Sequence, residues 1–338
     1  MKLPAMTPAG PRGESGSRAP GRGGAPAAVS PAPSAPRLRA LRHPRTADPG
    51  PVALPHVSTP RFLDLPAGVQ GTRVPAARGE LAALTATASG ERRAPVLLVP
   101  GFTGSKEDFL AVLSPLAAAG HPVTAVDQRG QFESPGDSDP ASYDVKVLAQ
   151  DLLAVARQLG EPVHLVGHSF GGLVARAVAL AEPAALRTLT LLASGPAALP
   201  RPAASNLALI AQALPVMDLP SIWVAKRQIE TQQGLSPAAP EIEEFLRRRF
   251  VANDPVALLR FAEQLLAEED QVDDLAAVGL PVLVLFGADD DAWPAGLQAE
   301  MAARLGARTV SLPGCGHSPA AECPDATVQA LIDFWAST

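Results

Sequence analysis

The sequence is poor in cysteine, with only Cys315 and Cys323 among its 338 residues. Two cysteines cannot build a disulfide framework or a zinc site of four cysteine ligands, and we expect both to be small buried side chains rather than a redox pair. The sequence also has no uncharged apolar run near the roughly 18 residues that a membrane span needs. An excess of basic charge is absent too, since 28 Lys and Arg stand against 34 Asp and Glu. This balance argues against nucleic acid as the main partner.

Hydrophobic residues make up 47% of the sequence and charged residues 18%, which is typical of a folded globular protein. Residues 1–60 differ from this average, with 13 prolines, seven glycines and eight Lys or Arg, but only Glu14 and Asp48 as acids. The segment has few large apolar side chains, and their burial could not offset the entropy that the chain loses on folding. We therefore expect a disordered tail, either a basic tether for an acidic partner or a dispensable segment. It has no apolar stretch typical of a secretory signal, so a cytoplasmic location is the default expectation.

Short aliphatic runs alternate with segments of helical spacing over residues 61–338. Six runs have the pattern of buried strands: 95–100, 123–126, 163–166, 189–192, 281–286 and 309–312. Continuous apolar strands separated by helices are typical of a parallel sheet covered on both faces. The sequence therefore predicts an α/β domain with a doubly wound, mostly parallel sheet, in which ligands bind at the carboxyl ends of the strands.

The alternation is interrupted at residues 197–280. This segment has four stretches of helical pattern with no strand between them: 207–214, 222–229, 240–250 and 256–268. Because the chain leaves and rejoins the sheet at the carboxyl edge, we expect a helical lid over that edge, inserted before the strand at 281–286. A second helical subdomain packed elsewhere is the alternative.

The segment Gly167-His168-Ser169-Phe170-Gly171 has the G-x-S-x-G pattern and lies between a predicted strand and a predicted helix. Small flanking residues allow a tight, strained turn that lifts the serine hydroxyl above the sheet. A dinucleotide or phosphate loop is excluded, because the segment contains neither G-x-G-x-x-G nor Gly-Lys-Ser/Thr. Ser169 is therefore the predicted nucleophile.

A second glycine-containing turn, Pro100-Gly101-Phe102-Thr103-Gly104-Ser105, follows the first predicted strand. Its glycines would let backbone N–H groups approach a developing oxyanion, and backbone donors need no side-chain reorganisation. We expect the N–H groups of Phe102 and of Phe170, the residue after the serine, to form this oxyanion hole. A plain connecting loop is the alternative.

Two further strand ends carry an acid and a histidine. Asp289, Asp290 and Asp291 follow the strand at 281–286, and His317 follows the strand at 309–312. A serine hydroxyl needs an imidazole to take its proton, and the imidazole needs a carboxylate to hold its tautomer. The other five histidines are placed differently: His43 and His56 in the tail, His121 before a strand, His164 inside one, and His168 pointing away from Ser169 by the geometry of the turn. His317 is therefore the predicted base, with the three aspartates open as its partner.

Taken together, these motifs resemble the α/β-hydrolase superfamily over residues 61–338. The matching segments are 100–105, Asp127-Gln128-Arg129-Gly130, 167–171, 287–294 and Gly316-His317. The resemblance implies an esterase-like serine hydrolase with Ser169 as nucleophile and His317 as general base. It implies Asp290 as the orienting acid, since the family places the acid three residues after the glycine. It also implies that Asp127 and Arg129 form a bracing pair in the loop near the site rather than act in catalysis.

The sequence departs from the family in one turn. Many members carry His-Gly where this chain has Pro100-Gly101, which should alter the shape of the loop without removing its backbone donors. A serine at position 169 argues against the haloalkane dehalogenase and epoxide hydrolase branches, which attack with aspartate.

The implied reaction cleaves an ester, thioester or similar acyl bond of a small-molecule substrate through an acyl-enzyme, with no cofactor and no metal. Apolar residues in 197–280 suggest a hydrophobic substrate: Ile222, Trp223, Val224, Phe245 and Phe250. One alternative is a cofactor-free perhydrolase, a carbon–carbon bond hydrolase or an acyltransferase that uses the same three residues. The other is a non-catalytic small-molecule binder. No particular oligomeric state is indicated.

Overall fold

A computed structural model of the chain describes residues 58–160 and 162–338. The predicted tail lies outside these residues except for its last three. Ser58 and Pro60, which the sequence analysis places in the tail, are buried. None of the helices in the described part of the chain is long and apolar enough to cross a membrane.

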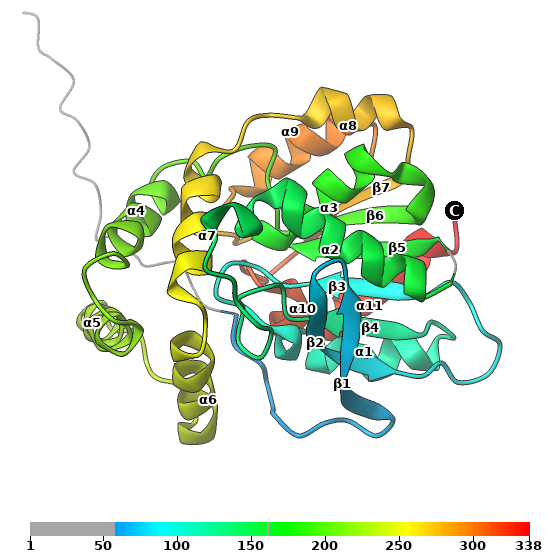
Figure 1. Cartoon of the computed structure of the whole chain (residues 1–338). Helices are drawn as coiled ribbons and strands as arrows, with labels where there is room; N and C mark the ends of the chain where they lie inside the picture. The colour runs from blue at the N-terminus through cyan, green and yellow to red at the C-terminus, as the bar shows by residue number, and fades with distance from the viewer. Residues whose placement is uncertain (1–57, 161) are drawn as a thin grey trace, which may run out of the picture. The chain divides into compact units, whose positions relative to one another are not determined.

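The domain is built on an eight-stranded sheet with the order β1-β2-β4-β3-β5-β6-β7-β8 (Figure 1). The strands are β1 Val69–Ala76, β2 Gly79–Ala86, β3 Val96–Val99, β4 Val123–Val126, β5 Val163–His168, β6 Leu186–Leu192, β7 Val282–Gly287 and β8 Arg308–Leu312. β2 pairs antiparallel with both β1 and β4, and all other neighbours run parallel. The prediction of a doubly wound, mostly parallel sheet is confirmed.

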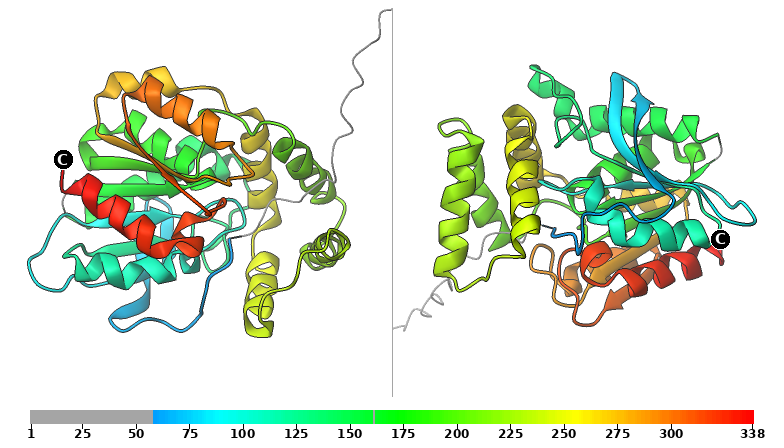
Figure 2. Two further views of the ribbon diagram at one scale, coloured as in Figure 1. Left: turned by 180° about the vertical axis from the view of Figure 1, so that it is seen from behind. Right: turned by 90° about the horizontal axis from the view of Figure 1, so that it is seen from below.

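Both faces of the sheet are covered by helices. In β3, Leu97 and Val99 join the apolar cluster on one face, while Val96 and Leu98 join the cluster on the other, as the two-residue period of a strand requires. The first face is covered by α2 (Val145–Gln158), α3 (Phe170–Ala181), α8 (Val272–Val278) and α9 (Ala295–Leu305). The second is covered by α1 (Leu110–Ala118), α10 (Pro319–Glu322) and α11 (Pro324–Trp335) (Figure 2).

The antiparallel hairpin β1–β2 was not expected from the sequence. β1 is the edge strand, and most of its side chains are exposed or half-buried, so it has no continuous apolar run. Gly71 and Pro75 further weaken its strand pattern. The buried residues of β2 are mainly alanine and leucine, which do not distinguish a strand from a helix.

The segment predicted to be wholly helical contains α4 (Ala203–Ala213), α5 (Leu219–Gln232), α6 (Pro240–Val251), α7 (Pro255–Ala267) and α8. α4, α5 and α6 share an apolar cluster of their own and stand beside the sheet in both figures. α7 contributes side chains to this cluster and to the core of the sheet. α8 packs only in the sheet core, so the separate helical layer is shorter than residues 197–280.

Candidate active site

Ser169 lies in a tight turn between β5 and α3. Its backbone has φ 53° and ψ −120°. A positive φ of this kind is a strained conformation for any residue that has a side chain. The turn packs closely on β3, because a Cβ added to Gly171 would lie 2.5 Å from the carbonyl oxygens of Val99 and Pro100. The strained turn predicted from the G-x-S-x-G pattern is therefore present, and it raises the Ser169 hydroxyl above the end of the sheet.

The structure brings together the three side chains that the sequence analysis singled out. His317 Nε2 lies 3.0 Å from Ser169 Oγ, and His317 Nδ1 lies 2.9 Å from Asp290 Oδ1. Ser169 follows β5, Asp290 follows β7 and His317 follows β8, so all three come from carboxyl ends of strands in one sheet. These contacts form a continuous chain from carboxylate to imidazole to hydroxyl.

Asp290 is held by a network of donors. Its Oδ1 accepts hydrogen bonds from the backbone N–H groups of Ala292 (2.9 Å) and Trp293 (3.3 Å), and its Oδ2 accepts one from Gln298 Nε2 (2.8 Å). Burial alone would raise the pKa of Asp290, but the hydrogen bond and charge of His317 and these donors hold it below its ordinary value. The carboxylate is therefore ionised and oriented at neutral pH.

The neighbouring aspartates do not compete for this position. Asp289 and Asp291 are both exposed, whereas the side chain of Asp290 is fully buried against His317. Of the three candidates left open by the strand end, the geometry places Asp290 against the imidazole.

The site contains two histidines whose pKa values are shifted in opposite directions. Burial lowers the pKa of His317, but the hydrogen bond and charge of Asp290 outweigh burial and raise it above its ordinary value. His168 has a pKa lowered to about 3 by burial and by the charge of His317, so it stays neutral. Its Nε2 lies 2.7 Å from the backbone oxygen of His317 and can donate to it. His168 thus contacts the His317 loop and lines the cavity at Ser169, a position that the sequence did not indicate.

The turn at residues 100–105 lies directly against Ser169. A Cβ on Gly101 would lie 2.9 Å from Ser169 Cβ, so only glycine allows this approach. The N–H of Gly104 donates a hydrogen bond to Gly101 O at 3.1 Å and so closes a turn. The N–H of Phe102 lies within this turn and takes no part in that hydrogen bond. Phe170 is the first residue of α3, where N–H groups have no acceptor within the helix. Both predicted oxyanion donors thus come from segments that flank the Ser169 hydroxyl.

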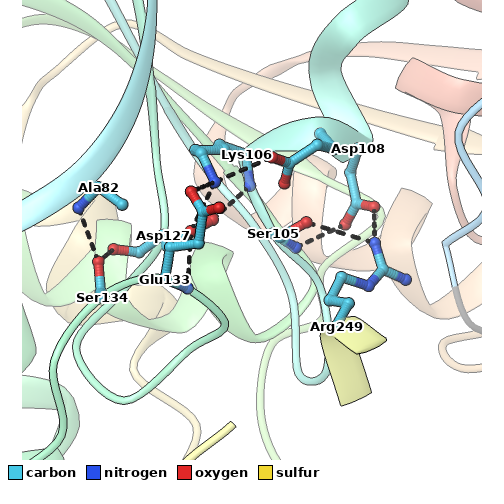
Figure 3. A network of polar contacts seen from close by, with 9 residues as sticks. Ala82, Ser105, Lys106, Asp108, Asp127, Glu133, Ser134 and Arg249 are labelled. Carbon is cyan, nitrogen blue, oxygen red and sulfur yellow. Dashed lines mark hydrogen bonds and ion pairs between the residues drawn. The ribbon is translucent and has the colours of Figure 1, made fainter. Parts of the chain in front are cut away.

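A network of ion pairs and hydrogen bonds holds the end of this turn at Ser105 (Figure 3). The short helix η1 (Lys106–Phe109) follows it, and Asp108 Oδ2 accepts from the N–H of Ser105 at 3.2 Å. Asp108 Oδ1 accepts from Arg249 of α6 at 2.5 Å, with both side chains nearly fully buried. The ion pair therefore ties the separate helical layer to the turn.

A second pair in the same network ties η1 to the end of β4. Lys106 Nζ lies 2.9 Å from Asp127 Oδ2 and 2.8 Å from Glu133 Oε2. Arg129, by contrast, pairs with Asp151 of α2, with Nε 2.9 Å from its Oδ2. Asp127 and Arg129 thus brace the loop as members of two separate ion pairs and not as one pair, and neither touches Ser169.

A cavity of about 70 Å³ opens at Ser169 and His317. Gly101, Phe102 and Thr103 form one side of it. The helices beside the sheet form the other side with Leu207, Ile210, Lys226, Phe250 and Leu265. Lys226 and Arg249 were not singled out from the sequence, because a charged side chain in a helix most often faces solvent.

Of the five apolar residues that suggested a hydrophobic substrate, Phe250 lines this cavity and the other four do not. Ile222, Trp223 and Phe245 pack inside the cluster of α4–α6, and Val224 is exposed. These four residues therefore give no support to a hydrophobic substrate, because helices need such residues for their own packing.

Other reactive sites could come from the two cysteines or from a group of side chains able to bind a metal ion. Cys315 is buried and Cys323 half-buried, and both are free thiols. Burial, followed by the contact with Cys323, raises the pKa of Cys315, so its thiol stays protonated. Within residues 58–160 and 162–338, no group of three or more His, Cys, Asp or Glu side chains could hold a metal ion.

Known proteins match most of the chain. A protein of Variovorax paradoxus (strain S110) named as a carbamate hydrolase, RutD, is 30% identical over 254 residues, which are 71% of this chain and 91% of that protein. The pimeloyl-[acyl-carrier protein] methyl ester esterase of Aeromonas hydrophila subsp. hydrophila is 29% identical over 65% of this chain and 87% of the esterase.

A solved structure has the same fold. The thermophilic esterase from Thermogutta terrifontis superposes with a TM-score of 0.63 at 26% identity, covering 79% of this chain and 98% of the esterase. Residues 96–330 also match the Alpha/beta hydrolase family. The resemblance seen in the motifs is thereby confirmed, and the chain is a hydrolase that belongs to the alpha/beta hydrolase family.

Proposed function

We propose that the protein is a serine hydrolase that cleaves an ester, thioester or similar acyl bond of a small, largely apolar substrate through an acyl-enzyme. The observation that carries this proposal is the chain of contacts from Asp290 through His317 to Ser169, which ends in a cavity. The names of the relatives, a carbamate hydrolase and two esterases, support chemistry at an acyl carbon.

The reaction follows from these positions. Ser169 Oγ attacks the carbonyl carbon while His317 Nε2 takes its proton, and Asp290 stabilises the resulting imidazolium. The oxyanion accepts hydrogen bonds from the N–H groups of Phe102 and Phe170, with the N-terminus of α3 adding its positive dipole end. As the intermediate collapses, His317 protonates the leaving group. Water, deprotonated by His317, then attacks the acyl-enzyme and releases the acid and Ser169.

Helices α4–α6 act as the lid in this proposal. Leu207 and Ile210 of α4 and Phe250 of α6 face the cavity opposite Ser169, so a bound acyl chain would be enclosed between the sheet and these helices. Removing water from the reacting carbonyl strengthens the interaction of the oxyanion with its donors.

Covalent labelling tests the proposed mechanism. We expect an alkyl fluorophosphonate to modify the folded protein once, on the peptide that contains Ser169, and to abolish hydrolysis of nitrophenyl esters in proportion. Peptide mass spectrometry locates the label, and heat-denatured protein is the control. Hydrolysis that continues after full labelling of Ser169 would contradict the proposal, and absence of both labelling and hydrolysis would favour a non-catalytic binder.

The pH dependence of kcat/KM is a second expected result. Protonated His317 cannot accept the proton of Ser169, so activity should fall as the pH decreases through the pKa of His317. Because Asp290 holds this pKa above its ordinary value of 6.5, the midpoint should lie above pH 6.5. His168, with a pKa of about 3, should add no step in this range. A neutral ester and constant ionic strength isolate the effect, and a midpoint below pH 6.5 would argue against His317 as the base.

A further inference from the structure

Lys226 is an unusual component of the cavity wall. It lies on α5 with 7% of its surface exposed, and it lines the same cavity as Ser169 and His317. Among the described residues that line this cavity, it is the only lysine or arginine. The lid otherwise contributes apolar side chains, so a positive charge is set into an apolar wall.

Lys226 shares its ion-pair partner with a second cation. Its Nζ contacts Glu230 one helical turn later. Glu230 also accepts from Arg227, and Arg227 lies 3.2 Å from Glu243 as well. If Lys226 turned to a ligand, Glu230 would therefore keep a cationic partner. The long, flexible lysine side chain makes such a movement possible with little strain.

The other charged groups at the cavity do not oppose an anion there. Asp108 lines the cavity, but Arg249 and the N–H of Ser105 already satisfy its two oxygens. Burial disfavours the charged form of Lys226 and lowers its pKa, while Glu230 opposes this effect. Burial deprives the ammonium group of its hydrogen bonds with water, and a bound anion would replace them.

We propose that Lys226 recognises a carboxylate at the end of the substrate's acyl chain, remote from the bond that is cleaved. This inference rests on the proposed function and narrows it to acyl substrates that have an apolar stretch followed by an acidic group. The apolar side chains between Ser169 and Lys226 would contact the stretch, and the ammonium would contact the acid.

The test compares paired substrates. Mono-(4-nitrophenyl) esters of linear dicarboxylic acids, from succinate to suberate, are each matched with an isostere in which an isopropyl group replaces the free carboxylate. At one chain length we expect the wild-type protein to prefer the acid. Lys226→Met should lower kcat/KM for that ester roughly 10- to 100-fold and change the isostere only about threefold, as expected for one charge-assisted hydrogen bond.

Arg247→Met is the matched control. It removes a cation of α6 that pairs with Glu244, outside the ion-pair group of Lys226, and that does not line the cavity, so the ratio of acid to isostere should stay as in wild type. Equal losses for both esters in Lys226→Met, or a wild-type preference for the isostere at every length, would overturn the inference. Both results would leave the proposed function intact, since the isostere is still cleaved through Ser169.

Protection from labelling gives a readout that does not depend on turnover. Free dicarboxylates should slow fluorophosphonate labelling of wild-type Ser169 more than monocarboxylates of the same length, and this difference should vanish in Lys226→Met. Equal protection in wild type would contradict the role of Lys226. If Ser169 is not labelled at all, the proposed function fails, and the inference fails with it.

Discussion

Replacing Ser169 by alanine is expected to lower kcat for a nitrophenyl ester by roughly 10⁴- to 10⁶-fold. The change removes the atom that attacks the carbonyl, and no other described residue places a nucleophile between His317 and the two backbone donors. The fold should persist, because alanine has the same Cβ in this strained backbone and the hydroxyl forms a hydrogen bond only with His317 among the described residues. Initial rates on saturating ester, with thermal unfolding of the same samples, measure both effects.

Ser194→Ala is the matched control for this change. Ser194 is fully buried behind the Ser169 turn, and its hydroxyl has no hydrogen-bond partner among the described residues. The variant loses a side-chain oxygen from the same region as Ser169→Ala does. Its activity should stay within about twofold of wild type, because the Ser194 hydroxyl makes no hydrogen bond that could be lost. Activity retained in Ser169→Ala would show that the ester is cleaved by a different group.

Replacing Asp290 by asparagine is expected to lower kcat by about 10³- to 10⁴-fold. An amide in this position can donate to His317 Nδ1, which favours the tautomer whose Nε2 carries a proton and cannot accept one from Ser169. The variant also loses the negative charge that raises the pKa of His317, so the acid limb of kcat/KM should move to lower pH. Steady-state kinetics from pH 5 to 9 records both changes.

The neighbouring acids provide controls of identical chemistry. Asp289→Asn and Asp291→Asn alter exposed carboxylates, and we expect kcat within about threefold of wild type, as for surface charges screened by water. Asp291 contributes to the raised pKa of His317, so its variant should show a small downward shift of the acid limb. A loss in Asp289→Asn comparable to that in Asp290→Asn would reassign the acid.

Much of the fold could be predicted because buried parallel strands have a strong local signal. The runs at 95–100, 163–166 and 281–286 are continuous and aliphatic, as strands covered on both faces must be. The β1–β2 hairpin has no such signal, since an exposed edge strand needs no continuous apolar run. The ends of the predicted strands also located the site, because parallel strands bring their carboxyl ends to one edge.

The sequence by itself determined the order of the six parallel strands along the chain, the strained turn at Ser169 and the small set of residues able to serve it. These depend on neighbours a few positions apart, so local pattern is sufficient. Only the tertiary structure decided which aspartate meets His317, that His168 supports the His317 loop, and that Asp127 and Arg129 join separate ion pairs. It also placed Lys226 at the cavity. Each of these depends on contacts between segments far apart in the sequence, and the packing of the sheet and helices determines such contacts.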